Sequence, residues 1–245
     1  MQVTEGLSFD HDDRRRIYEH IESRGLVAPE AVREALRIDP RGFCHHLAIL
    51  KRDGRIEAEG EKLRVAFEDG ESEEHRADGI AFTIRMARQD DLSGLVGAIR
   101  AVAEAGTYIE AETVADLIDH EEVLLRHNEL GSRVFFVATV EEEVVGWVHL
   151  DAAELDKLSH TAEITVGVLE AYRGHGIGSQ LLERGLQWAA ASGYEKIYQA
   201  IPAANEEAIA FLETHGWETE AVRNDHYKIS GAYVDEVMMA VALPQ

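Results

Sequence analysis

The chain has 245 residues, of which 24 are Lys or Arg and 47 are Asp or Glu, giving a net charge of −23 at pH 7. This length exceeds that of one small domain and is sufficient for two, each with its own buried core. The single cysteine, Cys44, excludes an intrachain disulfide. The first residues contain no apolar signal segment and no later run reaches about 18 apolar residues, so we expect a soluble, cytoplasmic protein.

The excess of acidic residues is accompanied by a scarcity of lysine, since Lys51, Lys62, Lys157, Lys196 and Lys228 are the only ones. A strongly charged surface repels itself unless salt screens it, and the Debye length falls to about 3 Å at 1 M salt. This composition suggests a halophilic protein. An acidic protein of a non-halophilic cell is the alternative.

The N-terminal part has the pattern of three helices followed by a β-hairpin. The expected helices cover residues 12–24, 29–36 and 40–53, with Pro at the start of the second and third and Gly after the first and third. The expected strands, 55–59 and 62–67, flank a Gly-Glu turn. This order resembles a winged helix-turn-helix domain, which we place at residues 1–67.

The charge of this part differs from that of the whole chain. From position 14 to position 64 there are twelve basic and nine acidic residues, a net of +3. Arg41, Lys51, Arg52 and Arg55 lie on the expected recognition helix and wing, which makes residues 10–67 a candidate for binding DNA or a protein. The alternative is a helical module that docks on the second domain or dimerises.

The tripeptide Cys44-His45-His46 raises the question of a metal site. Adjacent residues on a helix point about 100° apart, and no second pair at metal-ligand spacing is evident. We therefore expect no metal, a buried Cys44 and an exposed histidine. Residues 68–79 follow, with many acids and no apolar periodicity, and predict a solvated linker.

Residues 80–245 form the second expected domain, in which strands and helices alternate. This order indicates an α/β or α+β fold. A charged turn of three glutamates separates two of the strands, which predicts a hairpin. The expected strands are 82–86, 134–140, 144–150, 162–169, 196–201, 218–229 and 233–243, and the expected helices are 92–102, 112–128, 181–189 and 205–215.

The segment R-G-H-G-I-G at 173–178 lies between a strand, A-E-I-T-V-G-V at 162–168, and a helix. Together with N-E-E-A-I-A-F-L-E-T-H-G-W at 205–217 and G-A-Y-V-D-E-V-M-M-A at 231–240, it resembles the GNAT superfamily of acyl-CoA N-acyltransferases. The resemblance extends over residues 82–243. It implies the GNAT fold, with a mixed, mostly antiparallel central sheet, and acetyl-CoA as cosubstrate.

Glycines allow the backbone to approach a phosphate closely, and the free N–H groups of a helix start attract anions. Glycines that serve only close packing of strand and helix are the alternative. The resemblance implies that the pyrophosphate of acetyl-CoA lies on this loop, that the pantetheine pairs with the preceding strand, and that two strands diverge to admit the thioester. The candidate cofactor-binding residues are Val166, Gly167, Val168, Arg173, Gly174, His175, Gly176, Ile177, Gly178, Ser179 and Asn205.

The catalytic candidates are Glu163 and Tyr227. Glu163 matches the strand glutamate that is the base in some members of the family, and a carboxylate can take the proton that an amine must lose. A solvent-facing strand residue is the alternative. Many members have a tyrosine as general acid where this chain has Leu212, so Tyr227, with His226 and Tyr233 as further options, is the candidate acid.

The expected function is transfer of an acetyl group from acetyl-CoA to a primary amine, which is a small amine, an amino acid or a protein lysine. A DNA-binding regulator that senses acetyl-CoA without turnover is the alternative from another class. The acceptor and the oligomeric state stay open, with a homodimer as one option.

Overall fold

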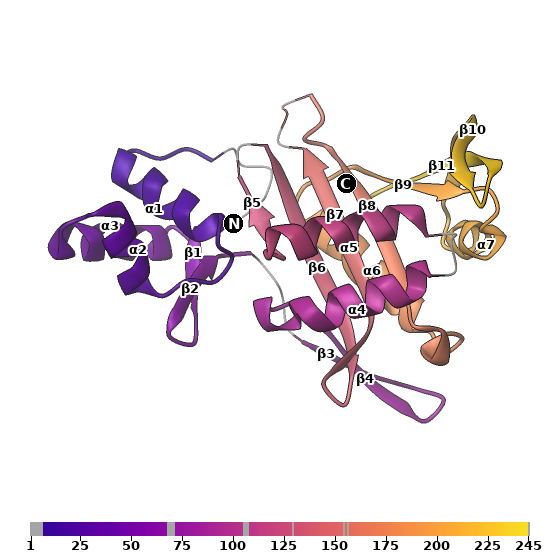
Figure 1. Cartoon of the computed structure of the whole chain (residues 1–245), viewed down its shortest axis with the longest axis horizontal. Helices are drawn as coiled ribbons and strands as arrows, with labels where there is room; N and C mark the ends of the chain where they lie inside the picture. Colours follow the sequence, from indigo (N-terminus) through magenta and orange to yellow (C-terminus); the bar gives the residue numbers. More distant parts are fainter. Residues whose placement is uncertain are drawn as a thin grey trace.

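The computed structural model describes residues 7–67, 72–104, 108–128, 130–153, 155 and 157–244. Figure 1 shows a small N-terminal module at one end and a larger α/β domain beside it. No helix in these ranges is long and apolar enough to cross a membrane.

The N-terminal module contains the three helices and the hairpin that the sequence predicts. Its elements are α1 (Asp12–Glu22), α2 (Pro29–Leu36), α3 (Pro40–Arg52), β1 (Ile56–Glu59) and β2 (Lys62–Val65), with the two strands antiparallel. Proline begins both α2 and α3, and the Asp39 carboxylate caps α3 by accepting hydrogen bonds from the N–H groups of Arg41 and Gly42. The elements are confirmed, whereas kinship with winged helices stays a prediction.

Helix α1 docks the module onto the larger domain. The Tyr18 hydroxyl donates to the carbonyl of His127 at 2.7 Å, and the buried Glu22 carboxylate accepts from Asn128 at 2.8 Å and lies 3.4 Å from Arg126. A buried carboxylate is stable only when it is paired in this way. Docking on the second domain, one of the arrangements considered for the module, is therefore present.

The larger domain is built on one nine-stranded sheet in the order β10-β11-β9-β8-β7-β6-β4-β3, with β5 paired to β6. The described neighbours pair antiparallel except β8 and β9, which are parallel. The predicted mixed, mostly antiparallel sheet is confirmed. The strands are β3 (Glu73–Ala77), β4 (Ile80–Met86), β5 (Arg126–His127), β6 (Gly131–Val140), β7 (Glu143–Ala153), β8 (Thr161–Val168), β9 (Lys196–Pro202), β10 (Glu218–Ile229) and β11 (Ala232–Ala242).

Helices cover both faces of this sheet. The helices are α4 (Leu92–Ala103), α5 (Ile109–Glu121), α6 (Ile177–Ala191) and α7 (Glu206–Thr214), with 3₁₀ turns at Gln89–Asp91 and Glu170–Tyr172. In Figure 1, α4 and α5 cross in front of the sheet. Helix α6 packs on the opposite face, where Gly185 lies close to Val148 and Ile164.

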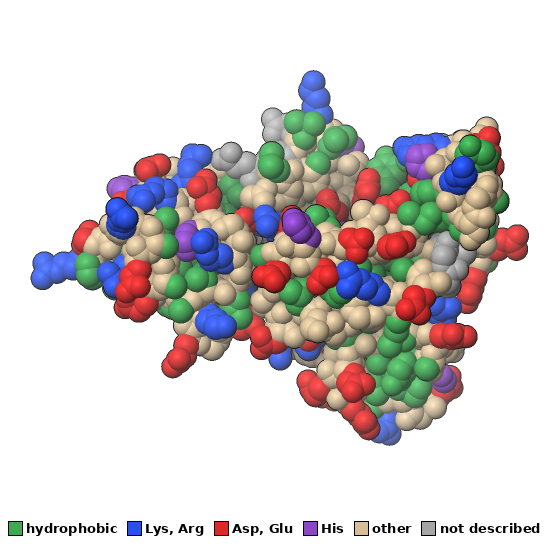
Figure 2. Space-filling model, viewed as in Figure 1, with side chains coloured by type: hydrophobic (Ala, Val, Ile, Leu, Met, Phe, Trp, Pro, Cys, Tyr) green, Lys and Arg blue, Asp and Glu red, His purple; other side chains and the backbone are tan. Residues whose placement is uncertain are grey.

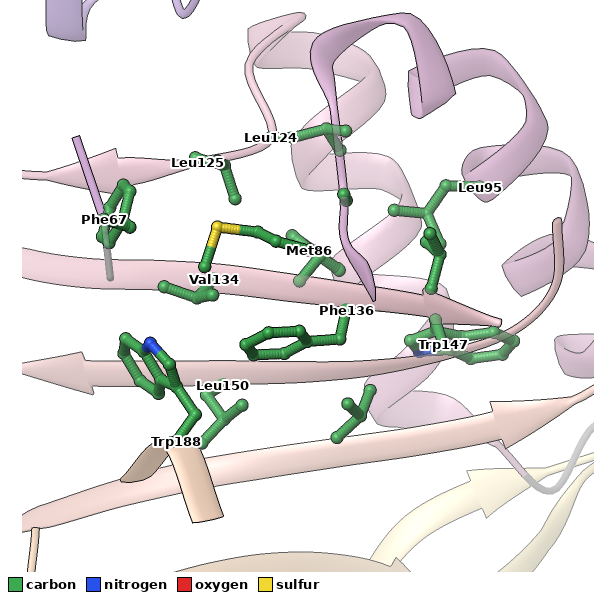
Figure 3. Close-up of a cluster of buried hydrophobic side chains, with 14 of the residues drawn as sticks. Phe67, Met86, Leu95, Leu124, Leu125, Val134, Phe136, Trp147, Leu150 and Trp188 are labelled. Atoms are coloured by element: carbon green, nitrogen blue, oxygen red, sulfur yellow. The ribbon is translucent and has the colours of Figure 1, made fainter. Parts of the chain in front are cut away.

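The core consists of side chains that alternate between these two faces. On the α6 side, the rings of Phe136 and Trp188 lie with their centroids 6.3 Å apart. Trp147 and Leu95 of α4 are fully buried and belong to the cluster of buried hydrophobic side chains in Figure 3. Both faces of the central strands are thus covered, which explains why the middle parts of β6 and β7 are buried at every position.

Two predicted segments differ in the structure. The helix expected over 112–128 ends at Glu121, because Glu122 adopts a left-handed conformation (φ 56°), and the chain then forms β5. The prediction of a linker over 68–79 is wrong in its described part, because residues 73–77 form β3. The His75 ring stacks on that of Phe82, with the ring centroids 5.2 Å apart. Edge strands tolerate charged side chains, so acid-rich composition did not exclude a strand. Residues 68–71 lie outside the described part.

Candidate active site

The site lies where β8 and β9 separate. The two strands are paired only at Thr161 with Lys196, Ala162 with Ile197 and Glu163 with Tyr198. Beyond Glu163 they are no longer partners, and a cavity of about 420 Å³ opens, bordered by β8, β9 and the starts of α5, α6 and α7. The expected divergence of these strands is therefore confirmed.

The loop before α6 has the geometry of an anion cradle. Gly174 (φ 80°) and Gly176 (φ 76°) both take left-handed conformations that other residues rarely adopt, and a Cβ at either would point into open space. Helix α6 begins after Gly176, and no side chain among the described residues caps this helix start. The first N–H groups of this 15-residue helix therefore face the cavity without an internal acceptor, and the helix dipole adds positive potential there.

Most of the sequence-predicted cofactor residues line this one cavity. They are Val166, Gly167, Val168, Arg173, Gly174, Gly176, Gly178, Ser179 and Asn205. Two do not: His175 lies 3.4 Å from the exposed carboxylate of Asp78, and Ile177 is buried in the core. Asn205 also caps α7 by accepting from the N–H of Ala208 at 3.2 Å, so its capping role and its place at the cavity coexist.

Arg173 braces the loop in addition to facing the cavity. Its Nε donates to the carbonyl of Val168 at 3.0 Å, and its guanidinium lies 5.7 Å from the ring centroid of Tyr108. The first contact ties the end of β8 to the loop, and the second is a cation–π contact with the segment before α5. Part of this guanidinium is therefore committed to holding the cavity wall.

Gly167, which the sequence analysis predicts only as a cofactor-binding residue, also has a packing role. A Cβ at this position would lie 2.2 Å from the Trp147 ring, which crosses directly over the glycine. The two residues are partners in the β7–β8 register. Only glycine leaves room for this indole beside the cavity.

Carboxylates gather beside the diverging strands. Glu163 of β8 faces its register partner Asp151 of β7. Glu163 is exposed and does not line the cavity, which fits the alternative of a solvent-facing strand residue. Partial burial nevertheless raises its pKa, the charges of Asp151 and Glu236 raise it further, and Arg223 partly offsets them. A carboxylate with a raised pKa is a stronger base, which suits proton removal from an amine.

A second group of polar residues is centred on Glu236, which is only 2% exposed. Its Oε1 accepts from the Tyr227 hydroxyl at 2.8 Å, and its Oε2 lies 2.8 Å from an Arg223 nitrogen. The Tyr227 hydroxyl also lies 3.2 Å from Oε1 of Glu110, a residue that lines the cavity. The pKa of Glu110 is raised, chiefly by burial and further by the charges of Glu163 and Glu236. The hydrogen bond from Tyr227 offsets part of this increase.

An irregularity in β10 makes this arrangement possible. The β10–β11 register shifts between Arg223 and Tyr227, where Asp225 takes a positive φ of 55° and its N–H donates to Asp235 at 2.8 Å. Such a bulge changes the direction in which neighbouring side chains point. Arg223, His226 and Tyr227 all reach Glu236 as a result.

The candidate general acids are not equivalent. Burial and hydrogen bonding to Glu236 raise the pKa of Tyr227 far above its ordinary value, which makes it a weak proton donor. His226 lies 3.3 Å from Glu236. Tyr233 is 66% exposed, with Lys228 over its ring, and does not reach the cavity. Leu212 is buried and lines the cavity without a hydroxyl.

The histidines of the N-terminal module form a group that the sequence did not reveal. His46 is buried and lies with His11 and Asp13, their ligand-type atoms all within 4.8 Å of one another. However, Asp13 pairs with Arg16 at 2.8 Å, and the His11 ring accepts from the Asp13 N–H. Both contacts compete with a metal ion, and we assign no metal site. Cys44 is exposed, contrary to expectation, because α3 turns it away from the core.

Glu110 and Glu236 are the site residues that sequence reasoning missed. Glu110 lies outside the helix expected over 112–128, and the structure places it in the first turn of α5. Glu236 offered a signal, since Asp235 and Glu236 are adjacent in an otherwise apolar strand and must point to opposite faces of the sheet, so that one of them faces inward. A buried carboxylate in such a run requires partners, and these come from β10.

The comparisons with known proteins agree with this geometry. Residues 104–217 match the Acetyltransferase (GNAT) family. The Bacillus subtilis protein YwnH is 29% identical over 138 residues, which cover 55% of this chain and 83% of that protein.

Solved structures support the same fold. An acetyltransferase of the GNAT family from Streptococcus pneumoniae aligns with a TM-score of 0.55 and 19% identity over 66% of this chain and 99% of that chain. The yncA protein of Salmonella typhimurium, whose structure contains acetyl-CoA, aligns with a TM-score of 0.55 and 20% identity. The alignment covers 67% of this chain and 95% of that chain. At these identities the likeness concerns the fold. Residues 104–217 thus match the GNAT family model, and the larger domain has the fold of the GNAT acetyltransferases.

Proposed function

We propose that the enzyme transfers the acetyl group of acetyl-CoA to a primary amine by direct attack, without a covalent acetyl-enzyme. The observation that carries this proposal is the single cavity that joins an uncapped helix start to the opening between β8 and β9, with carboxylates beside it. The cavity is large enough for a linear thioester arm, and its two ends suit an anion and an amine respectively.

Cosubstrate binding is assigned to the loop and the end of β8. The N–H groups from Gly174 to Ser179 would hold the pyrophosphate, supported by the charge of Arg173. The backbone of Val166 to Val168, released from pairing with β9, would pair with the pantetheine amides. The acetyl carbonyl then lies in the opening, where a backbone N–H of the same strand can stabilise the oxyanion.

Glu163 is assigned as the base. An amine is protonated near neutral pH and must become neutral before it can attack, so Glu163 takes one proton from the ammonium group. The amine then forms a C–N bond to the carbonyl carbon as the C–S bond breaks. The second proton leaves with the thiolate, and the proton on Glu163 passes to water. A thiol pKa of about 8.5 makes thiolate a good leaving group, so Leu212 in place of a tyrosine is compatible with turnover.

Two measurements test the proposal. Mass spectrometry of the purified protein should detect co-purified CoA or acetyl-CoA. A thiol-release assay with acetyl-CoA and a panel of amines, amino acids and peptides should show amine-dependent turnover. Absence of turnover with every acceptor would contradict the proposal and favour a domain that senses acetyl-CoA.

The cradle can be tested by adding a negative charge at Ser179. Replacing Ser179 with glutamate should raise the KM for acetyl-CoA by about tenfold or more, because the carboxylate would repel the pyrophosphate. The same charge at the start of α6 should leave the melting temperature unchanged or raise it. Ser179→Gln is the matched control, with similar size and no charge. Equal KM values for the two variants would argue against a phosphate at this helix start.

Binding of DNA by residues 10–67 stays a prediction. Arg41, Lys51 and Arg52 are exposed on α3, while α1 is occupied by docking, and Figure 2 shows several basic side chains on the module. If the prediction holds, the protein should be retained on duplex DNA at low salt, with retention lost as salt rises and on replacing these three residues with alanine. A protein that is not retained at low salt would refute it.

A further inference from the structure

We infer that the acceptor is a small primary amine that carries a second positive charge and no carboxylate, such as an α,ω-diamine. This inference rests on the proposed acetyl transfer and names the substrate class of the same site. Of the groups concerned, Glu110 lines the cavity, and Glu163 and Glu236 act on it from beside the cavity.

Three carboxylates from three elements act on one another there: Glu110 of α5, Glu163 of β8 and Glu236 of β11. The permanent cation that reaches this group is Arg223, 2.8 Å from Glu236. The three carboxylates and Arg223 sum to a net charge of −2; Asp151, which also acts on Glu163, is offset by Arg133 and is not counted. The Tyr227 hydroxyl joins Glu110 to Glu236 but adds no charge.

Burial makes this imbalance costly for the unliganded site. Glu236 is almost fully buried, and burial is the first cause of the raised pKa of both Glu110 and Glu163. Opposite charge supplied by a ligand would relieve the repulsion. A ligand with two positive charges would neutralise the group, whereas a zwitterionic amino acid would not.

The described cations around the cavity are already engaged. Arg223 pairs with Glu236, and Arg173 donates to the Val168 carbonyl and faces Tyr108 on the cosubstrate side. In this part of the structure no further Lys or Arg lines the cavity. A carboxylate on the carbon that bears the attacking amine would therefore meet negative charge without a partner.

The proton balance of the reaction requires the second charge to be remote from the attacking nitrogen. Glu163 takes a proton from the attacking ammonium, which removes one negative and one positive charge together. Glu110, Glu236 and Arg223 then retain a net charge of −1. The second ammonium group of a diamine balances this charge and stays protonated while the C–N bond forms and the C–S bond breaks.

Matched acceptors separate these contributions. Lysine differs from 1,5-diaminopentane by its carboxylate, and pentylamine differs from it by lacking the second ammonium group. The kcat/KM for each should be measured at saturating acetyl-CoA. We expect 1,5-diaminopentane to exceed both others by about tenfold or more, and this preference should shrink as salt screens the charges. A lysine-containing peptide extends the comparison to protein acceptors.

The variant Glu110→Gln tests the assignment, since it removes one charge and keeps a hydrogen-bond acceptor for Tyr227. The ratio of kcat/KM for 1,5-diaminopentane to that for pentylamine should fall several-fold. Glu112→Gln, an exposed acid in the same helix turn, is the control and should keep the ratio of the unaltered enzyme.

The outcomes are distinguishable. Turnover of lysine, peptide or pentylamine at a rate equal to or above that of the diamine would overturn the inference and leave the proposed function intact. An equal ratio in Glu110→Gln and Glu112→Gln would overturn the assignment to Glu110. No turnover with any amine would overturn both the inference and the proposed function.

Discussion

Replacing Glu163 with glutamine should lower kcat for amine acetylation by about 10²- to 10⁴-fold, because the variant cannot take the proton that the acceptor must lose. The KM for acetyl-CoA should change little, since Glu163 does not line the cavity, whose walls include the loop and the β8 backbone. Steady-state kinetics and a thermal melt of the same preparation check the result. The defect should shrink at high pH, where solvent deprotonates the amine, whereas a purely structural role would give a defect independent of pH.

The role of Glu163 as the base also predicts how kcat depends on pH. The base must be ionised, so kcat should fall as pH decreases through the raised pKa of Glu163, at a higher pH than for an ordinary glutamate. Asp151 contributes to this increase in pKa. Asp151→Asn should therefore move the acidic limb of the profile to lower pH. A limb that stays in place in this variant would mean that another group limits the rate.

Replacing Gly167 with alanine should destabilise the protein by roughly 1–3 kcal/mol or more, because the new methyl group would lie 2.2 Å from the Trp147 ring. β8 and the buried indole must then move apart, which would also distort the cavity wall. Chemical denaturation should show a lower midpoint, and the KM for acetyl-CoA should rise in the same variant.

Two further variants give this prediction its control. Gly97 is exposed in α4, and a methyl group on its Cα would meet no described atom within 4 Å, so Gly97→Ala should stabilise the helix by up to about 1 kcal/mol. Combining Gly167→Ala with Trp147→Phe should cost less than the sum of the two single changes, since the smaller ring relieves the contact. Additive costs would show that the indole is not the cause.

The strand, loop and helix around the cradle could be predicted from sequence because each carries a local signal. β-branched residues mark β8, glycines mark the loop, and leucines at helical spacing mark α6. The N-terminal helices were predictable for the same reason, through prolines and capping residues. These features depend on neighbours in the chain, and the structure reproduces them.

The acceptor end could not be predicted, because its residues meet only through tertiary pairing. Tyr227 and Glu110 are 117 positions apart in the chain, and their contact depends on the bulge in β10. The charged strand β3 and the early end of α5 were misjudged for a related reason. β3 is formed by pairing with β4, and α5 ends at Glu121, before the left-handed Glu122, where no glycine or proline marks the end.

The docking of α1 has a consequence for how the chain reaches its native state. Tyr18 and His127 are 109 positions apart, and their hydrogen bond forms only after β5 exists. Contacts between distant positions require closure of a long loop and slow the search for the native state. On the ribosome, the first module can form its own helices early, yet it settles against the rest only once more than half of the polypeptide has emerged.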